Sequence, residues 1–430
     1  MLASALGEDR AKQAAKTAAY MACMGNVMEG VSDWCEGYTL SGPVLSSQSA
    51  STLFGSITHD ERMTFFRAWA ADRAAGQAIA YDVTSFSTYA KGITDAEWGY
   101  NRDGDRLPQV NLGCYLSQQS GLPIFYVTYP GSIEDKSHLP YMMAYNDELG
   151  IKDVVFVMDK GFCATLNVRH MHASRLPYIM GADGSHKATR AAMDSVRDGI
   201  VTMSRRIGEG VYANTVRSTF YGEQSNLHVF CDPALAERQR ADMQRAIEVK
   251  EEKLRQLEQL TKREAKRYSD LFDIILSGNG SFAFSRNYAK IDTAARDAGF
   301  FCLLTNTDCD SREVLEIYRR KDMVEKGFDD LKNHIDMKRL RTHSESTTEG
   351  KLFVAFVSLI VVSHISNMLG SFMKERSMSK GALIAEMEKI RVVFTMGGSR
   401  LMNPITKTQR TIIEGLGFTE GDLKSYVSCG

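Results

Sequence analysis

One segment of the chain, residues 318–332, combines side chains that could hold a metal ion and the phosphates bound to it. Its sequence, YRRKDMVEKGFDDLK, contains a tyrosine, a lysine, a glutamate and a second lysine: Tyr318, Lys321, Glu325 and Lys332. Because successive residues of an α-helix are about 100° apart, one unbroken helix would carry all four within about one sixth of its circumference. The glutamate could bind a metal ion, and the lysines could hold nearby phosphates.

A second stripe of the same expected helix is apolar. It consists of Ile317, Val324, Phe328, Leu331 and Ile335, about 100° from the charged row. This stripe can pack on a sheet while the charged row faces the edge of the sheet. The alternative interpretation is an ordinary solvated face, which is what most rows of charged side chains are.

Two aspartates elsewhere favour the chemical interpretation. Asp82 lies within the strand-like AIAYDVTSFS, and Asp159 ends the apolar run VVFVM. A carboxylate buried alone in such surroundings is costly, so it is normally paired, hydrogen-bonded or bound to a metal. The alternative for each is a turn or cap residue at the end of a strand, which is commoner for Asp159 because Lys160 and Gly161 follow it.

Asp82, Asp159 and Glu325 together would suit Mg²⁺, which prefers oxygen ligands. Two such ions about 3.5–4 Å apart can activate a water or a 3′-hydroxyl and stabilise the leaving oxygen of a phosphodiester. We therefore expect the three carboxylates to converge, with no two more than about 10 Å apart. Mn²⁺ would substitute for Mg²⁺.

Strands and helices far apart in the sequence must bring these acids together. Alternating and β-branched residues predict strands at 78–87, 109–117 and 122–130 that pair as a meander. A short apolar run within 153–162, ended by Asp159 and Gly161, predicts a buried central strand. Helices are expected at 8–35, from Thr58, from 234 to about 270 and from about Asp310, with a polar connector at 41–52. The gap between Asp159 and Glu325 is much longer than that between the aspartates, which predicts an inserted domain.

Composition restricts the class of protein. The net charge is −1 and the sequence pI is about 6.8, so any nucleic-acid binding must come from local basic patches. The eight cysteines are scattered without a CxxC pair, which fits a reducing cytoplasm and argues against structural zinc. No signal peptide is evident, and the most apolar run, 352–362, is too short to span a bilayer. We expect a soluble protein that does not bind membranes.

The same residues resemble a known family signature. Insertion-sequence DDE transposases, members of the RNase H-like or retroviral-integrase superfamily, carry the motif Y-x2-R-x3-E-x6-K. Tyr318, Lys321, Glu325 and Lys332 stand at its four positions, and Lys321 replaces the usual arginine, which loses bidentate phosphate contacts. YDVTSFS and MDKGF resemble the two aspartate segments, and GLPIFYVTYPGSIED, LLTNTD and PITKTQRTIIEGLG resemble other family segments. The resemblance covers about residues 78–417.

The resemblance implies an α/β fold: an RNase H-like mixed sheet with flanking helices, interrupted by an inserted α+β domain, plus a helical N-terminal region. Five parts are expected: a helical N-terminal region considered for DNA binding (1–77), the first part of the catalytic core (78–183), an insertion domain with a long charged helix (184–298), the second part of the core with the glutamate helix (299–375), and a helical C-terminal region (376–430).

The implied function is that of a DNA transposase acting on double-stranded DNA. It would bind terminal inverted repeats, cleave phosphodiester bonds at the element ends and transfer the 3′-hydroxyl strands to target DNA. Asp82, Asp159 and Glu325 would be catalytic and hold two Mg²⁺ ions, while Tyr318, Lys321 and Lys332 would contact DNA. A homodimer in a synaptic complex and a cytoplasmic, nucleoid-associated location are expected. The alternatives are an RNase H-like nuclease without strand transfer and a non-catalytic DNA-binding derivative of a transposase.

Overall fold

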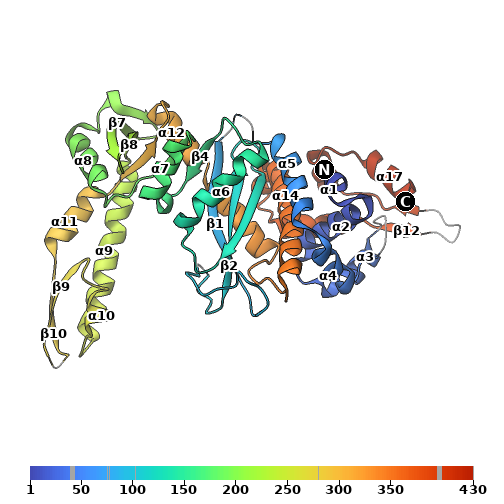
Figure 1. Cartoon of the computed structure of the whole chain (residues 1–430), viewed down its shortest axis with the longest axis horizontal. Coiled ribbons are helices and arrows are strands. Elements are labelled where there is room, and N and C mark those ends of the chain that lie inside the picture. Colours follow the sequence, from blue (N-terminus) through green and yellow to red (C-terminus); the bar gives the residue numbers. More distant parts are fainter. Residues whose placement is uncertain are drawn as a thin grey trace. The chain divides into compact units, whose positions relative to one another are not determined.

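The computed structural model describes residues 1–38, 44–74, 76, 78–101, 103–278, 280–394 and 400–429. For residues 428 and 429 it describes the backbone alone. The chain forms two compact units (Figure 1). Unit 1 consists of Met1–Pro177 and Ile317–Gly430, and unit 2 of Tyr178–Glu316. Unit 2 is thus one continuous segment that interrupts unit 1 in sequence, and it extends beyond the range 184–298 predicted for the insertion. Asp82, Asp159 and Glu325 all belong to unit 1.

The sheet of unit 1 has the strand order β3-β2-β1-β4. Its strands are β1 (Ala78–Ser87), β2 (Gln109–Ser117), β3 (Pro123–Pro130) and β4 (Val155–Met158). β1 to β3 form an antiparallel meander, as predicted, with a register shift in β2 between Tyr115 and Leu116. β4 runs parallel to β1. All nine residues of β2 are buried, so the sheet is covered on both faces.

Helices supply this cover. They are α5 (His59–Ala71), α6 (Asp135–Leu149), α7 (Thr165–Ala173), α13 (Asp322–Asp329) and α14 (Glu345–Glu375), with short η2 (Lys160–Phe162) after β4. α5 begins with the predicted capping box, in which Thr58 and Glu61 cap each other. Its buried Phe66 packs edge-on against Phe125 of β3 and Phe353 of α14, with ring centroids 5.0 and 5.9 Å apart. These aromatic contacts join the helical region to the sheet.

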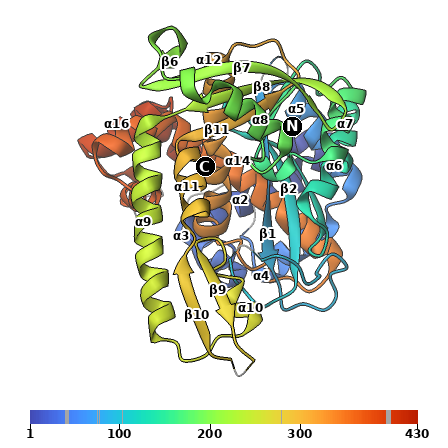
Figure 2. The ribbon, with the colours of Figure 1, turned by 90° about the vertical axis from the view of Figure 1, so that its left-hand side faces the viewer.

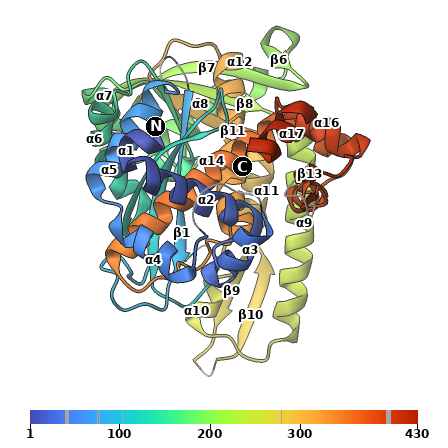
Figure 3. The same cartoon turned by 90° about the vertical axis from the view of Figure 1, so that its right-hand side faces the viewer.

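α14 is the central helix of unit 1. Figure 3 shows it running beside α2 (Glu8–Met24), and it also contacts α4 (Ser47–Ser56) and β3. By length and composition alone α14 could cross a membrane, because the helix extends well beyond the apolar run 352–362. However, 61% of its most apolar window is buried inside the protein. Gly350 explains the close contact with α4, because a Cβ there would lie 1.9 Å from the Phe54 carbonyl oxygen.

Two predictions for the N-terminal region are wrong in detail. The expected single helix at 8–35 is interrupted, because Gly25 ends α2 with a φ of 83° that favours glycine, and η1 (Met28–Gly30) and α3 (Val31–Gly37) follow. The expected polar connector at 41–52 contains the first half of α4, which Ser46 and Ser49 begin with a capping box. Residues 39–43 lie outside the described part of the chain. α1 (Leu2–Leu6) precedes α2.

The C-terminal part of unit 1 is a smaller cluster. It contains α15 (Lys380–Met387), the antiparallel pair β12 (Val392–Phe394) and β13 (Arg400–Met402), α16 (Lys407–Gly415) and α17 (Glu420–Cys429). Leu383 of α15 and Ile412 of α16 pack on Leu369 near the end of α14. α14 therefore connects this cluster to the sheet.

The strands of unit 2 are hydrogen-bonded in the order β5-β11-β8-β7-β6, with antiparallel pairing throughout. Its strands are β5 (Tyr178–Gly181), β6 (Arg206–Gly208), β7 (Val211–Phe220), β8 (Glu223–Cys231) and β11 (Phe300–Thr305). The remaining elements are α8 (Lys187–Val196), η3 (Arg197–Gly199), η4 (Met203–Arg205), α9 (Pro233–Gln256), α10 (Lys262–Ala265), β9 (Phe272–Leu276), β10 (Phe282–Arg286) and α11 (Tyr288–Asp297). β11 is thus one of the strands of unit 2.

The long charged helix of unit 2 is shorter than predicted. α9 ends at Gln256, not near 270, because Leu257 is extended and the chain turns back. Leu260 then packs with Ile247 and Leu254 of α9 against Phe272 of the β9–β10 hairpin. Figure 2 shows α9 standing beside that hairpin. The apolar track is thus a packing surface for the hairpin rather than a coiled coil.

The chain is a mixed α/β protein with a mixed sheet, many flanking helices and a helical N-terminal region. This part of the sequence-based prediction is confirmed. The pairing of β1 with β2 and β4 also places the first two candidate acids on neighbouring strands.

Candidate active site

Asp82 and Asp159 lie side by side in the sheet of unit 1. The parallel register pairs Ala80 of β1 with Val157 of β4. Two residues further along both segments, the same register places Asp82 opposite Asp159. Neighbouring strands are about 4.8 Å apart, and residues paired in this way share one face of a sheet. Both residues line one open cavity of about 710 Å³.

Three residues that follow unit 2 in the sequence gather at Asp159. The Tyr318 hydroxyl donates a hydrogen bond to Asp159 Oδ1 over 3.1 Å. Lys321 Nζ lies 3.5 Å from the same oxygen and 3.6 Å from Glu325 Oε1. The Asp159 and Glu325 oxygens are therefore separated by at most the sum of these two distances, 7.1 Å, which is inside the expected limit for this pair.

Electrostatics supports the placement of Asp82 in the same site. Burial raises the pKa of Tyr318, and the negative charges of Asp159, Asp322 and Asp82 raise it further. The tyrosine hydroxyl therefore stays protonated and can act as a donor to Asp159. The Asp82 carboxylate also accepts a hydrogen bond from the Val83 backbone N–H over 2.8 Å.

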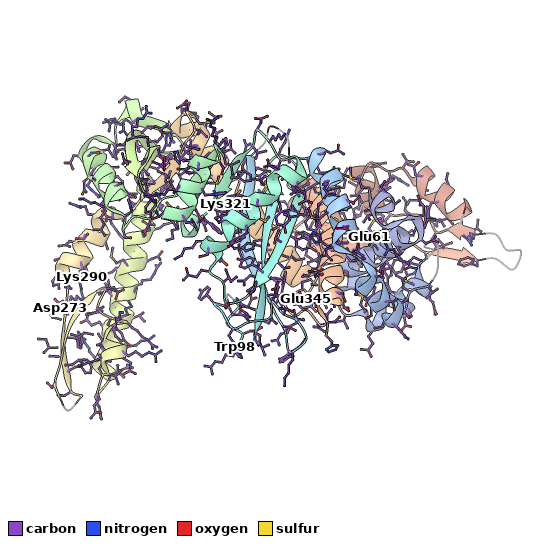
Figure 4. The ribbon with its side chains drawn as sticks, viewed as in Figure 1. Glu61, Trp98, Asp273, Lys290, Lys321 and Glu345 are labelled. Carbon is purple, nitrogen blue, oxygen red and sulfur yellow. The ribbon has the colours of Figure 1, made fainter. Side chains whose placement is uncertain are left out.

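Lys321 is the buried cation of this site. Its side chain is 6% exposed, whereas those of Asp159 and Glu325 are 48% and 66% exposed. Its ammonium also lies 5.9 Å from the centroid of the Tyr318 ring. Lys321, labelled in Figure 4, thus lies between two carboxylates, where it neutralises part of their charge.

The prediction of one unbroken helix through residues 318–332 is wrong. α12 (Ser311–Arg319) ends before Lys321, which lies in a turn, and α13 begins at Asp322. The turn forms because successive backbone bonds there join residues three apart, such as Lys321 N–H to the Tyr318 carbonyl at 3.0 Å. The break is consistent with the division of the chain, because Val314 of α12 is buried in unit 2 and Val324 of α13 in unit 1.

A second irregularity follows α13. Residues Asp330–His334 form a π-helix, η5, closed by a bond from Ile335 N–H to the Asp330 carbonyl over 2.8 Å. π-Turns are rare and are frequently found at functional sites. The apolar stripe survives both irregularities, since Val324, Phe328, Leu331 and Ile335 are all buried. α13 contacts β1, which carries Asp82.

Lys332 does not share the exposed face predicted for it. It is 8% exposed, and its ammonium lies 2.6 Å from Asp103 Oδ2 in the connection between β1 and β2. Arg339 forms a similar pair with Asp105 over 3.2 Å. These two ion pairs hold the β1–β2 connection to the segment that follows Glu325.

The donor chemistry of the acids fits Mg²⁺ or Mn²⁺, since all three side chains offer carboxylate oxygens. Within the described ranges, however, no group of three or more His, Cys, Asp or Glu side chains is already assembled as a metal site. Asp159 and Glu325 instead share the Lys321 ammonium. The place between them therefore attracts a cation.

Sequence reasoning missed several residues of the cavity. Gln109 and Asn111 of β2 line it and are joined by a 3.0 Å bond between their side-chain amides. Lys160 and Tyr100 line it as well. The amides did give a signal in the sequence, because two polar residues spaced two apart begin an otherwise apolar strand.

Known proteins are similar to this chain. A family model described as a transposase DDE domain matches residues 73–361, which include all three acids. No curated protein matches the chain. Among solved structures the chain is similar to the piggyBac transposase in a cryo-EM synaptic complex with hairpin DNA, with a TM-score of 0.40 and 9% identity over 98% of this chain and 75% of that one. Because the family model spans more than half of its length, this chain belongs to the transposase DDE domain family.

Proposed function

We propose that this protein binds the terminal inverted repeats of a mobile element, cleaves phosphodiester bonds at the element ends and transfers the 3′-hydroxyl strands to target DNA. It would act as a homodimer on double-stranded DNA in the cytoplasm, at the nucleoid. The observation that carries the proposal is the convergence of acids from three elements. Asp82 of β1 is in register with Asp159 after β4, and Asp159 shares Lys321 with Glu325 of α13.

The proposal assigns Asp82, Asp159 and Glu325 to two divalent metal ions. When bound, such ions activate the attacking hydroxyl and stabilise the leaving oxygen of the phosphodiester. Tyr318 orients Asp159 through its hydrogen bond. Lys321, placed at the same two carboxylates, can reach a phosphate there but offers a single charged point rather than the planar fork of arginine.

We propose that Lys332 contacts a DNA phosphate only after it leaves Asp103. In the structure the Lys332 ammonium is paired with Asp103 Oδ2, 2.6 Å away. DNA binding would exchange this carboxylate for a phosphate oxygen, which is chemically similar. The β1–β2 connection would then lose one of its two ion pairs with the segment that follows Glu325.

A strand-transfer assay tests this function. A pre-cleaved element end with a free 3′-hydroxyl is incubated with target plasmid and Mg²⁺, and joined products are separated by gel electrophoresis. We expect joining by the wild type and none by Asp159→Asn. Cleavage of intact ends without joining would support the nuclease alternative, and DNA binding without either reaction would support the non-catalytic one.

A further inference from the structure

The connection between β1 and β2, residues 88–108, presents three large aromatic side chains to solvent. Tyr89 is 73% exposed, Trp98 67% and Tyr100 85%. Figure 4 labels Trp98 at the edge of unit 1. Single exposed aromatic residues are ordinary, but three in one short connection are typical of a surface that binds a partner or ligand.

Hydrogen bonds and close packing hold residues 97–100 of this connection against the start of β2 and Gly131. Glu97 and Gln109 exchange backbone hydrogen bonds of 3.1 and 2.9 Å, and the Gln109 side-chain amide donates to the Tyr100 carbonyl over 3.0 Å. Gly99 packs so closely that a Cβ there would lie 1.7 Å from the Gly131 carbonyl oxygen. These contacts hold the backbone beside Tyr100, which presents the exposed ring.

Tyr100 lies at the candidate active site, and Tyr89 lies on the same connection just after β1. Tyr100 lines the cavity that contains Asp82 and Asp159. Its neighbour Asn101 donates a hydrogen bond to Ser87 Oγ over 3.0 Å. Ser87 and Tyr89 in turn line a second cavity of about 490 Å³.

Two arginines accompany this second cavity. Arg339 and Arg341 line it together with Tyr89 and pair with Asp105 and Asp336, and the Arg339 guanidinium lies 4.9 Å from the centroid of the Tyr89 ring. Aromatic rings alternating with cations are the arrangement by which proteins follow a single nucleic-acid strand, with bases stacked on the rings and phosphates near the cations.

We propose that Tyr100 and Tyr89 stack on unpaired nucleobases of the DNA strand whose phosphodiester enters the cavity of Asp82 and Asp159. This inference rests on the proposed function and adds to it a substrate in which bases near the scissile bond are unpaired. The observation that selects a nucleobase is that the exposed ring of Tyr100 lines that cavity. The contacts that hold the backbone beside Tyr100 limit the ordering cost of stacking.

Binding of two DNA probes tests the inference in the Glu325→Gln background, where DNA is not cleaved. One probe is a duplex with a short unpaired tail that carries a fluorescent adenine analogue, whose emission changes on stacking. The other is the same duplex fully paired. Since stacking contributes about 1–3 kcal/mol per base, we expect Tyr100→Ala to weaken binding of the tailed probe about 5- to 150-fold and to remove the emission change.

Three further variants make the result specific. Tyr89→Ala is expected to reduce the preference for the tailed probe, and Tyr100→Phe to retain it because the ring remains. Tyr141→Ala is the matched control, since Tyr141 is 68% exposed on α6 and lines neither cavity. If Tyr100→Ala keeps both the preference and the emission change, the inference is wrong while the proposed function stands. If the wild-type protein binds neither probe, both are wrong.

Discussion

Replacing Asp103 by asparagine should weaken the fold and strengthen DNA binding at the same time. Asp103 lies 2.6 Å from Lys332 Nζ, and the two side chains are 28% and 10% exposed. Breaking a fully buried ion pair costs about 3–5 kcal/mol, and losing an exposed one costs about 1 kcal/mol or less. For this intermediate exposure, and with asparagine keeping the shape, we expect the free energy of unfolding to fall by about 1–2 kcal/mol.

The same change removes the carboxylate that competes with DNA for Lys332. If Lys332 exchanges Asp103 for a phosphate, the cost of that exchange disappears in Asp103→Asn. A gain of about 1–2 kcal/mol corresponds to binding about 5- to 30-fold tighter. Urea unfolding and fluorescence anisotropy with an end-sequence duplex measure the two effects, which have opposite signs.

Two controls isolate the pair. Asp147→Asn removes an exposed carboxylate from α6 and should change neither quantity appreciably. In the Lys332→Ala background, Asp103→Asn should no longer tighten DNA binding. Tighter binding that persists without Lys332, or unchanged binding with Lys332 present, would refute the exchange of partners.

Three other variants give expectations of different kinds. Lys332→Ala alone should reduce the slope of log affinity against log salt by about one phosphate contact, and an unchanged slope in a salt series would exclude a phosphate role for this residue. Tyr318→Phe should lower the rate of end cleavage about 10- to 100-fold, because it removes the hydrogen bond that orients Asp159, and a wild-type rate in single-turnover assays would contradict that role. Lys351 is 3% exposed, and burial lowers its pKa to about 8, so its charged form destabilises the fold. Relative to Lys351→Met, the wild type should therefore gain about 3 kcal/mol of stability as pH rises from about 8 to about 10.5, and parallel stability curves in urea unfolding would contradict the shift.

Local sequence patterns were sufficient to predict the strands that carry the aspartates. Alternating and β-branched residues mark β1 and β2, and an apolar run marks β4, so the positions of Asp82 and Asp159 follow from their strands. The Thr58 capping box was predicted for the same reason, since its partners are three residues apart. The fold class is confirmed largely because these signals are local.

The features that could not be predicted from the sequence depend on packing between residues far apart in the chain. A helical wheel assumes a straight helix, so it missed the turn at Lys321 and the π-helix at Asp330–His334. It therefore placed Lys332 on the face of Glu325, although Lys332 is buried against Asp103, far away in the sequence. Likewise α9 ends early because Leu260 packs on the β9–β10 hairpin, a contact that periodicity within the helix does not encode.

End cleavage by Glu325→Gln in the presence of Mg²⁺ tests the central claim most directly. The change removes a charge needed by the metal while keeping the shape of the side chain and the buried stripe of α13. Because phosphate contacts supply most of the affinity, the variant should bind end-sequence DNA as the wild type does and cleave none of it. Glu414→Gln, on an exposed position of α16, is the matched control and should cleave normally. Wild-type cleavage by Glu325→Gln would contradict the account.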